Sequence, residues 1–450
     1  MELTLENSPA QPKIKTGMYL LETLTAGMYN EPLAIYREYI QNSADSIDLM
    51  AKKDKDFRVN IDLEPMKRRI TISDNGYGIS SEISESILCS LGDSNKINKN
   101  LRGFRGIGRL GGIAFSDKAT FQTKADGEKI ESVQEWDCKG LREYLNTPQK
   151  KLSLTEIVKK ITNYKQTNNK KASGSYFKVT LDGVKSFRNY IFDINKVKNY
   201  LSQIAPVPFD LNNFSYGQEI DEWLPKQLRT YGSYNIFLNN NPIFKPYRDT
   251  VKINKSAGDY IESIKKFEII IKDKKAAYGW IGLRKKMIGA ITRGEGTSGI
   301  RVRVGNILIG DSHLLDGCFR EDRFNSYIIG EIHVDCPQLI PNSRRDDFID
   351  NDYKTLFYNA IEREIGFSLS KEIRQKSRIF STQKAKNSTK KISISKGVNL
   401  KPRQDNNFSY NSNSTKQKIE EIVTMIKISY EDCQTRSKIL DKLKHLHEAM

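Results

Sequence analysis

The sequence predicts an α+β protein, because strand-like and helix-like segments alternate along most of its length. Residues 31–50 repeat apolar side chains at the three- and four-residue steps of a helix. Residues 57–63 and 69–73 instead alternate apolar and polar side chains with the period of a strand, and Pro65 lies in the turn between them. The segment 206–370 mixes both patterns again, which is typical of a second α+β domain.

The predicted helix at 31–50 has one apolar face and one polar face. Its apolar face carries Tyr36, Ile40, Ala44, Ile47 and Met50. Its other face places Glu38, Asn42 and Asp45 together. A carboxylate there can deprotonate or orient a water molecule, and an amide oxygen is a hard ligand that suits Mg²⁺. The same pattern is also typical of an ordinary solvated helix surface.

The second predicted strand runs directly into Asp74-Asn75-Gly76-Tyr77-Gly78. A carboxylate at position 74 can accept a hydrogen bond from an exocyclic amine, and Gly76 and Gly78 would let a flat base approach the backbone. This pattern favours a base-binding loop, although an ordinary Asp-Gly turn has the same residues.

A glycine-rich run follows at 103–112, with several arginines among its glycines. The glycines are Gly103, Gly106, Gly108, Gly111 and Gly112. Backbone amides in such a loop form a concave site for anions. The run has neither the GK[ST] of a P-loop nor the compact βαβ unit of a Rossmann fingerprint, so on its own it is weak evidence.

In this order, the three motifs resemble those of the GHKL ATPases, which include gyrase, the ninety-kilodalton heat-shock chaperones, histidine kinases, MutL and the MORC proteins. The resemblance covers about residues 17–185 and is strongest to the chaperone-like and MORC-like members. It implies a two-layer α/β sandwich of the Bergerat type that binds ATP with Mg²⁺.

The resemblance also implies roles for individual residues. Glu38 would be the general base that activates water, and Asn42 would hold Mg²⁺, with Asp45 in the same nucleotide-binding set. Asp74 would bind the adenine amine, supported by the glycines of its loop. Further nucleotide-binding residues would be Gly76, Gly78, Gly103, Gly106, Gly108 and Gly111.

Two more positions are implied with alternatives. Gly174-Ser175 stands where the family has a Gly-Thr that reaches the adenine, and Ser175 keeps the hydroxyl group. Residues 91–96 resemble a MORC-type motif at the edge of the lid over the phosphates. Lys96 in that motif is either a phosphate ligand or a solvated loop lysine.

The second domain resembles the transducer domain of the same families, in which a basic residue reaches back to the γ-phosphate. The corresponding segment is 339–348. Its Asn-Ser-Arg resembles the chaperone loop and favours Arg344, whereas counting back from Phe348 favours Arg345. Alternatively, these arginines are surface residues that pair with neighbouring aspartates.

The motifs divide the chain into five expected parts: an N-terminal strap (1–16), an ATP-binding domain (17–205), a transducer (206–370), a basic flexible linker (371–415) and a helical C-terminus (416–450). By the same resemblance we expect an ATP-driven clamp that closes as a homodimer on a macromolecular client.

The net charge bears on the identity of that client. The chain has 73 Lys and Arg against 55 Asp and Glu, a net charge of +18. Residues 371–415 hold eleven of these cations and two acids. Such a segment can bind the phosphates of DNA, as in MORC-like DNA compaction or antiviral defence, or it can be a solubilising linker. Nucleic acid is slightly favoured, and a protein client or partner subunit, as for a chaperone, is the alternative.

Other classes are disfavoured by what the sequence lacks. It has no run of 18 apolar residues that would span a membrane, and its first residues do not resemble a signal peptide. Its five cysteines are scattered singly and suit a reducing cytoplasm. Its four histidines form no metal motif.

Overall fold

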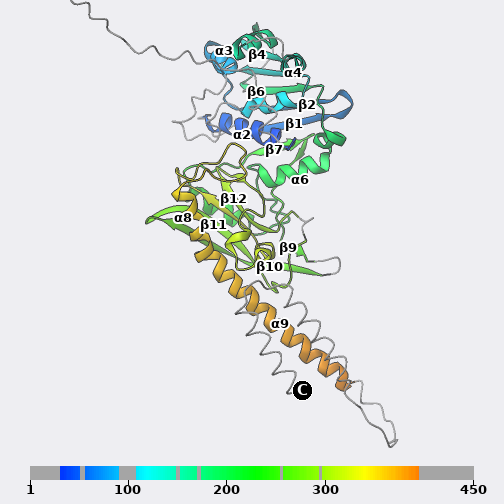
Figure 1. The fold of residues 1–450 in the computed structure, drawn as a ribbon, viewed down its shortest axis with the longest axis vertical. Helices are drawn as coiled ribbons and strands as arrows, with labels where there is room; N and C mark the ends of the chain where they lie inside the picture. The colour runs from blue at the N-terminus through cyan, green and yellow to red at the C-terminus, as the bar shows by residue number, and fades with distance from the viewer. Residues whose placement is uncertain are drawn as a thin grey trace, which may run out of the picture. The chain divides into compact units, whose positions relative to one another are not determined.

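The computed structural model describes residues 31–50, 56–90, 108–147, 153–169, 174–253, 257–292 and 296–394; for 109, 187–189 and 383–394 only the backbone is described. The chain divides into two compact units, Met1–Gln383 and Lys384–Met450. Two β-sheets organise the described part of the first unit (Figure 1). No helix in the described ranges is long and apolar enough to cross a membrane.

The first sheet has eight strands in the order β5-β4-β3-β6-β2-β1-β7-β8. They are β1 (Arg58–Glu64), β2 (Arg69–Asp74), β3 (Lys118–Lys124), β4 (Ile130–Asp137), β5 (Thr162–Asn168), β6 (Tyr176–Asp182), β7 (Asn235–Leu238) and β8 (Asn241–Pro242). In β1 every second side chain is buried, namely Val59, Ile61 and Leu63. The alternation expected at 57–63 and 69–73 is therefore confirmed, and it reflects one covered face.

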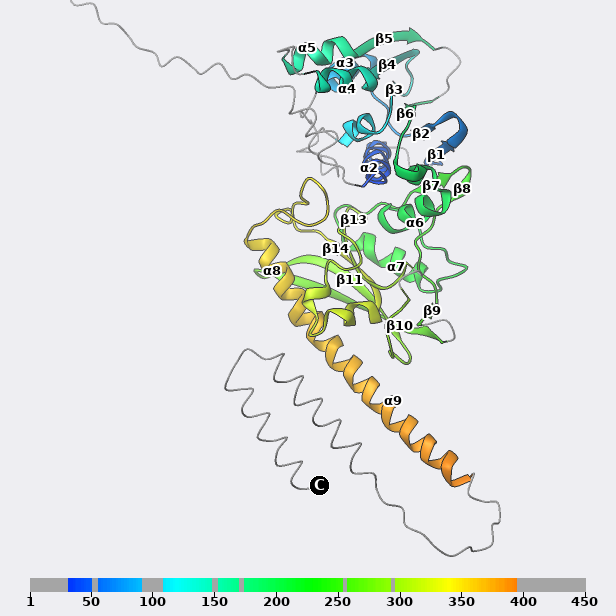
Figure 2. The ribbon, with the colours of Figure 1, turned by 45° about the vertical axis from the view of Figure 1, so that its right-hand side comes forward.

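Helices cover that face, so the expected two-layer α/β sandwich is present (Figure 2). They are α2 (Ala34–Asp48), α3 (Ser81–Cys89), α4 (Cys138–Asn146) and α5 (Leu154–Ile161), and α6 (Ile194–Ile204) packs on α2. Short 3-10 turns are η2 (Pro65–Lys67), η3 (Gly108–Ala114) and η4 (Phe187–Phe192). Tyr36, Ile40, Ile72 and Phe121 belong to the core between the two layers.

Strands β7 and β8 belong to the first sheet although they lie beyond residue 205, where we expected the ATP-binding domain to end. β7 runs parallel to β1, with Val59 opposite Ile236 and Ile61 opposite Leu238. Ile236 and Leu238 are both buried, and β7 pairs the backbone groups at that edge of β1. The expected boundary between 205 and 206 is therefore wrong for this sheet.

The second sheet has six strands in the order β13-β12-β14-β11-β10-β9. They are β9 (Thr250–Lys252), β10 (Gly258–Ile271), β11 (Lys274–Arg284), β12 (Gly299–Val304), β13 (Ile307–Ile309) and β14 (Ile329–Val334). The other elements here are α7 (Gly217–Trp223), α8 (Asp352–Ile361), η5 (Leu224–Lys226), η7 (Asp316–Cys318) and η8 (Asp322–Tyr327). α8 packs against β10, so this part is also α+β, as expected.

Helix α8 does not end at Gly366, although a glycine commonly follows the last turn of a helix. It continues through the π-helical turn η9 (Glu362–Gly366) into α9 (Phe367–Ile394). Gly366 is not in the left-handed conformation of a helix-ending glycine. Instead, a Cβ built on it would lie 1.8 Å from the carbonyl oxygen of Cys318. The glycine therefore permits close packing between this helix and the turn at Cys318.

Residues 371–394 are helical in α9, so the expected flexible linker is wrong for this part. Leu369 and Ile373 are buried in the core of the second sheet, and this fixes the first turns of the helix. The Lys, Arg and Gln residues that follow favour a helix. The expected linker at 395–415, the C-terminal segment 416–450 and the strap 1–16 lie outside the described residues.

Replacing Gly366 by Ala should lower the free energy of unfolding by about 1–3 kcal/mol, because the new methyl group must displace the backbone at Cys318. Gly317→Ala is the control, since nothing lies within 4 Å of a Cβ built there. Urea denaturation followed by circular dichroism measures both. Equal stability of Gly366→Ala and the wild type would show that close packing does not explain this glycine.

Candidate functional site

Helix α2 places Glu38 at the edge of the two-layer core. The helix follows a turn in which the Ala34 amide donates to the Glu31 carbonyl at 3.0 Å. Tyr36 and Ile40 are fully buried, which confirms the apolar face. The Glu38 side chain is 11% exposed on the other side, so it is sheltered by its neighbours and still accessible to water.

Asn42 and Asp45 follow Glu38 along α2, but they are not equally accessible. Asn42 is partly buried, whereas Asp45 is 1% exposed. The loop after β2 covers this end of the helix, because the Tyr77 amide donates to the Ser46 carbonyl at 2.9 Å. The three polar side chains predicted to lie together therefore differ in solvent exposure. Glu38 and Asn42 are partly exposed, whereas Asp45 is buried.

The loop after β2 is built against α2 by its glycines. Asp74 is 4% exposed, and its Oδ1 accepts a hydrogen bond from the Gly76 amide at 3.0 Å. A Cβ on Gly76 would lie 2.7 Å from the Ser46 backbone, and one on Gly78 would lie 2.2 Å from the Lys124 carbonyl oxygen. Gly78 also has a φ of +69°, so both positions require glycine.

Two hydroxyl groups hold this loop from the sheet side. Ser175 is 3% exposed, and its Oγ donates to the Gly76 carbonyl at 2.5 Å. Thr123 on β3, which sequence reasoning missed, accepts from the Ile79 amide at 2.9 Å and donates to the Tyr176 carbonyl. The Ser175 side chain thus binds the backbone of the predicted base-binding loop. Thr123 has no signal in the sequence beyond its place on a strand.

The described end of the glycine-rich run packs on α2 beside Glu38. A Cβ on Gly108 would lie 2.5 Å from the Glu38 Oε2 atom, and the Gly112 amide donates to the Tyr39 hydroxyl at 3.1 Å. Gly111 lies in the same turn, η3. The predicted residues Lys96, Gly103 and Gly106 lie outside the described residues.

One of the two arginines predicted from the second domain lies beside this same carboxylate. The Nε atom of Arg345 lies 3.9 Å from the Glu38 Oε1 atom, and Arg345 is 8% exposed. Arg344 is exposed and approaches α2 only through its carbonyl. Asp347, one of the alternative partners, pairs with Lys354 at 2.7 Å. Of the two arginines, Arg345 is the one whose side chain faces Glu38.

A tight turn holds Arg345 in this direction. Its φ is +56°, in the left-handed region that a side chain rarely adopts. The Arg345 amide donates to the Asn342 carbonyl, and its own carbonyl accepts from the Gly310 amide at 2.8 Å. A bridge between Pro341 and Phe348 closes the turn. Hydrogen bonds on both sides therefore stabilise the strained backbone.

Arg37 is a second residue that sequence reasoning missed. Its Nη2 atom donates to the Arg344 carbonyl at 2.8 Å, and its Nε atom lies 3.5 Å from the Glu38 Oε1 atom. Arg37 therefore links α2 to the turn that carries Arg345. The only signal in the sequence is that a cation directly precedes Glu38.

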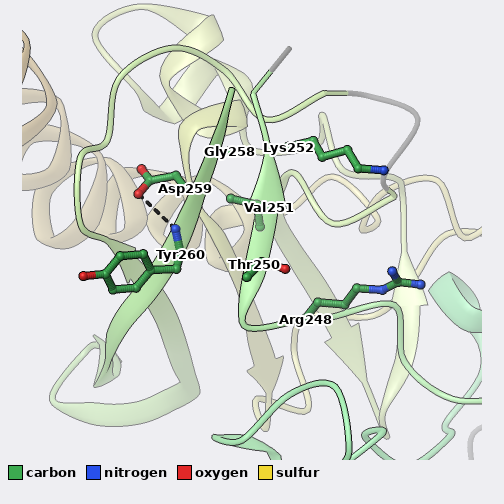
Figure 3. A pocket seen from close by; sticks show the side chains of 7 residues that line it. All are labelled: Arg248, Thr250, Val251, Lys252, Gly258, Asp259 and Tyr260. Carbon is green, nitrogen blue, oxygen red and sulfur yellow. Dashed lines mark hydrogen bonds between the residues drawn. The ribbon is translucent and has the colours of Figure 1, made fainter. Parts of the chain in front are cut away.

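A separate hollow of about 320 Å³ lies on the second sheet, between β9 and β10. Figure 3 shows Arg248 and Lys252 extending away from Asp259 and Tyr260. The Asp259 carboxylate accepts from the amides of Tyr260 and Met287, so its oxygens support the backbone. None of the predicted nucleotide-binding residues lines this hollow.

Comparisons with known proteins agree with the geometry around α2. Residues 33–170 match the family of histidine kinase-, DNA gyrase B-, and HSP90-like ATPases. Chaperone protein HtpG of Escherichia coli K12 and that of Escherichia coli O157:H7 are each 30% identical over 147 residues, covering 28% of this chain and 24% of theirs. The match thus spans about a quarter of the length of these relatives.

Among solved structures, the ATPase region of Saccharomyces cerevisiae topoisomerase II has a TM-score of 0.42 at 16% identity, covering 76% of this chain and 85% of that one. The family match at 33–170 contains α2 with Glu38, the loop that follows β2, which packs on α2 at Ser46, and Gly108, which packs on α2 at Glu38. Residues 33–170 of this chain therefore belong to the GHKL ATPase superfamily.

Proposed function

We propose that this chain binds ATP with Mg²⁺ beside α2 and hydrolyses it. The observation that carries the proposal is that a carboxylate, a glycine-rich turn and a cation lie together. Glu38 has the backbone of Gly108 against its Oε2 atom and the Arg345 guanidinium 3.9 Å from its Oε1 atom. A carboxylate, a glycine-rich backbone and a cation are the groups that phosphoryl transfer to water requires.

Recognition of the base would fall to the loop after β2. Asp74 would accept a hydrogen bond from the adenine amine, and Gly76 and Gly78, which pack against Ser46 and Lys124, would hold the loop in place beside it. The Ser175 hydroxyl supports this geometry, because it holds the Gly76 carbonyl from the opposite side. The loop would thus be a preformed surface that needs little rearrangement to bind a base.

Metal and phosphate binding would fall to α2 and the glycine-rich run. No three His, Cys, Asp or Glu side chains in the described residues could hold a metal ion. Mg²⁺ would therefore be bound by Asn42, with Asp45 behind it, and by phosphate oxygens and water, which is its usual environment at nucleotide sites. When bound, the ion neutralises phosphate charge. By family resemblance, Lys96, Gly103, Gly106 and Gly111 would cover the phosphates.

In the reaction itself, Glu38 would orient a water molecule toward the γ-phosphate and accept its proton. Arg345 would stabilise the charge that spreads over the equatorial oxygens in the transition state. The contact between these side chains supports this division of roles, since a phosphate that faces Glu38 lies within reach of Arg345. Arg344 would contribute only its backbone carbonyl.

The two groups come from opposite ends of the first unit's sequence, and this supports a clamp. Glu38 is carried by the first sheet's helical layer, while the turn at Arg345 is held by Gly310 after β13. A nucleotide that contacts both would fix one part against the other. By family resemblance, we propose that two copies close together on ATP. The free cysteines Cys89, Cys138, Cys318 and Cys336 are compatible with a cytoplasmic location.

Two clients have support. The net charge of +18 favours nucleic acid, and Lys371 and Arg378 on α9 are exposed cations. Against this, Arg374 pairs with Glu321 and Lys376 pairs with Glu372, so part of that basic segment is neutralised. The relatives named as chaperones favour a protein client. We retain DNA as the slightly favoured client, with a chaperone-like action on protein as the alternative.

Glu38→Ala should leave ATP affinity near the wild-type value and lower turnover by about 10²–10⁴-fold, because it removes the base and spares the adenine site. Asp74→Asn is the contrasting variant, for which binding itself should be lost. Calorimetry and a phosphate-release assay measure the two properties. Loss of binding in Glu38→Ala equal to that in Asp74→Asn would contradict the assignment of Glu38 as base.

Arg345→Ala should lower turnover by about 10²–10³-fold, because the cation at the γ-phosphate is lost. Arg344→Ala should remain near the wild-type rate, since alanine keeps the carbonyl that accepts from Arg37. Steady-state turnover at saturating ATP separates the two. If Arg344→Ala were the more damaging change, the orientation of the turn would not predict which arginine acts.

The nucleic-acid proposal predicts that Lys371→Glu combined with Arg378→Glu weakens DNA binding, because two exposed phosphate contacts are reversed in sign. Lys198→Glu combined with Lys226→Glu is the matched control, with the same change in net charge at exposed positions elsewhere. Fluorescence anisotropy with duplex DNA at two salt concentrations measures affinity. Equal affinities of both double variants would count against DNA binding at α9.

A further inference from the structure

A network of charged side chains is completely buried against β12 and β14 of the second sheet, and no sequence motif predicted it. The side chains of Lys245, Arg303 and Glu331 are all 0% exposed. The Lys245 amine donates to both Glu331 carboxylate oxygens at 2.9 Å, and the Arg303 Nε atom donates to Oε1 at 2.6 Å. Tyr247 and His333 complete the shell of this Glu331 network.

Stability alone does not explain such an arrangement. Burial lowers the pKa of Lys245 to about 8 and that of His333 to about 4, so at neutral pH the histidine is uncharged. The network then holds two cations on one carboxylate in a dry environment. Well-packed apolar side chains are often as stable as a buried ion group, whereas fixed hydrogen-bond directions set a geometry that apolar contacts leave free.

Arg303 of the Glu331 network and Arg301, which lies two positions before it on β12, both bind Gln203. Gln203 lies near the end of α6, where the chain leaves the helices of the first sheet. The Arg303 Nη2 atom donates to the Gln203 carbonyl at 2.9 Å, at the end of α6. The Arg301 Nε atom donates to the Gln203 side-chain oxygen at 2.6 Å. Asn306, which receives a hydrogen bond from Lys245, donates to the Gly232 carbonyl at 2.8 Å. The second sheet is thereby joined to α6 through directed hydrogen bonds.

The same strand leads to the turn that carries Arg345. β12 continues through Asn306 into β13, and the Gly310 amide after β13 donates to the Arg345 carbonyl. On the other side, α6 packs on α2, which carries Glu38. Glu38 and Arg345 are therefore connected in more than one way. They contact each other directly, and a chain of contacts also joins them through α6, Gln203, β12 and β13.

We propose that Gln203 and Arg303 are positioning residues that set the distance between Arg345 and Glu38. This inference rests on the proposed ATPase function. They touch neither substrate nor reacting atoms, but they fix α6 to β12, and that link lies on the longer route between the two proposed catalytic groups. The shorter route is the hydrogen bond from Arg37 to the Arg344 carbonyl. A displacement of about 1 Å at a reacting group can lower a rate by about 10²-fold.

Gln203→Met tests this with little change in shape. Methionine keeps the length of the side chain and removes its bonds to Arg301 and to the Gly296 carbonyl. Gln203 is only partly buried, so the fold should tolerate the change. Arg303→Lys is the second variant, because it keeps the cation at Glu331 and removes the bond to the Gln203 carbonyl. Tyr216→Phe is the control. It removes a 2.9 Å hydrogen bond to the Glu262 carbonyl, which lies outside the path between Glu38 and Arg345.

Both variants should bind ATP like the wild type and turn it over about 10–100-fold more slowly. In an Arg345→Ala background they should cause no further loss, because their effect passes through Arg345. Tyr216→Phe should keep the wild-type rate. An unchanged rate in both variants, or the same fold loss with and without Arg345, would overturn the inference and leave a structural role.

Hydrogen–deuterium exchange without nucleotide separates this inference from the ATPase proposal. Gln203→Met should speed exchange of the amides at 340–349, where the Arg345 turn lies, and Tyr216→Phe should not. Unchanged exchange in Gln203→Met would overturn the positioning role. A wild-type protein that fails to turn over ATP would refute the proposed function, and the exchange result would still decide whether Gln203 orders that turn.

Discussion

The contact between the Glu38 carboxylate and the Arg345 guanidinium is the interaction on which the proposed chemistry depends. The 3.9 Å distance between the two side chains is long for an ion pair. The contact joins α2, which covers the first sheet, to the turn at Arg345, which follows the second sheet. Both side chains are nearly enclosed, which strengthens electrostatic interactions relative to open water. A phosphate or a water molecule bound beside this pair would contact the proposed base and the proposed cation together.

Close packing of glycines on α2 brings the rest of the site to that contact. Gly76 approaches Ser46, Gly108 approaches Glu38, and Gly112 approaches the Tyr39 hydroxyl, each at a distance that a Cβ would not allow. The proposed adenine-binding loop and the glycine-rich run are therefore positioned by α2, the helix that carries the proposed general base, Glu38. This steric constraint explains why the glycines of both motifs lie against one helix although the motifs are far apart in the sequence.

The sequence was sufficient to predict α2, the loop after β2 and the superfamily, because glycines and carboxylates there leave local patterns. It left Arg344 and Arg345 undecided, since the direction of a side chain in a turn depends on a left-handed residue that no spacing reveals. The helix at 371–394 was missed because composition suggested a linker, while two buried side chains anchor it. β7 was assigned to the wrong part because strand pairing is a long-range property.

The Glu331 network shows the same limit in a different form. Its lysine and arginine lie 86 and 28 positions from the glutamate, so no window of sequence contains the cluster. Its role follows from where it lies, between the helix that packs on α2 and the strands that hold the Arg345 turn. Because the proposed base and cation belong to different sheets, the proposed turnover would require both parts to be correctly placed. Hydrolysis would then be controlled by conformation, as in a clamp whose slow step is closure.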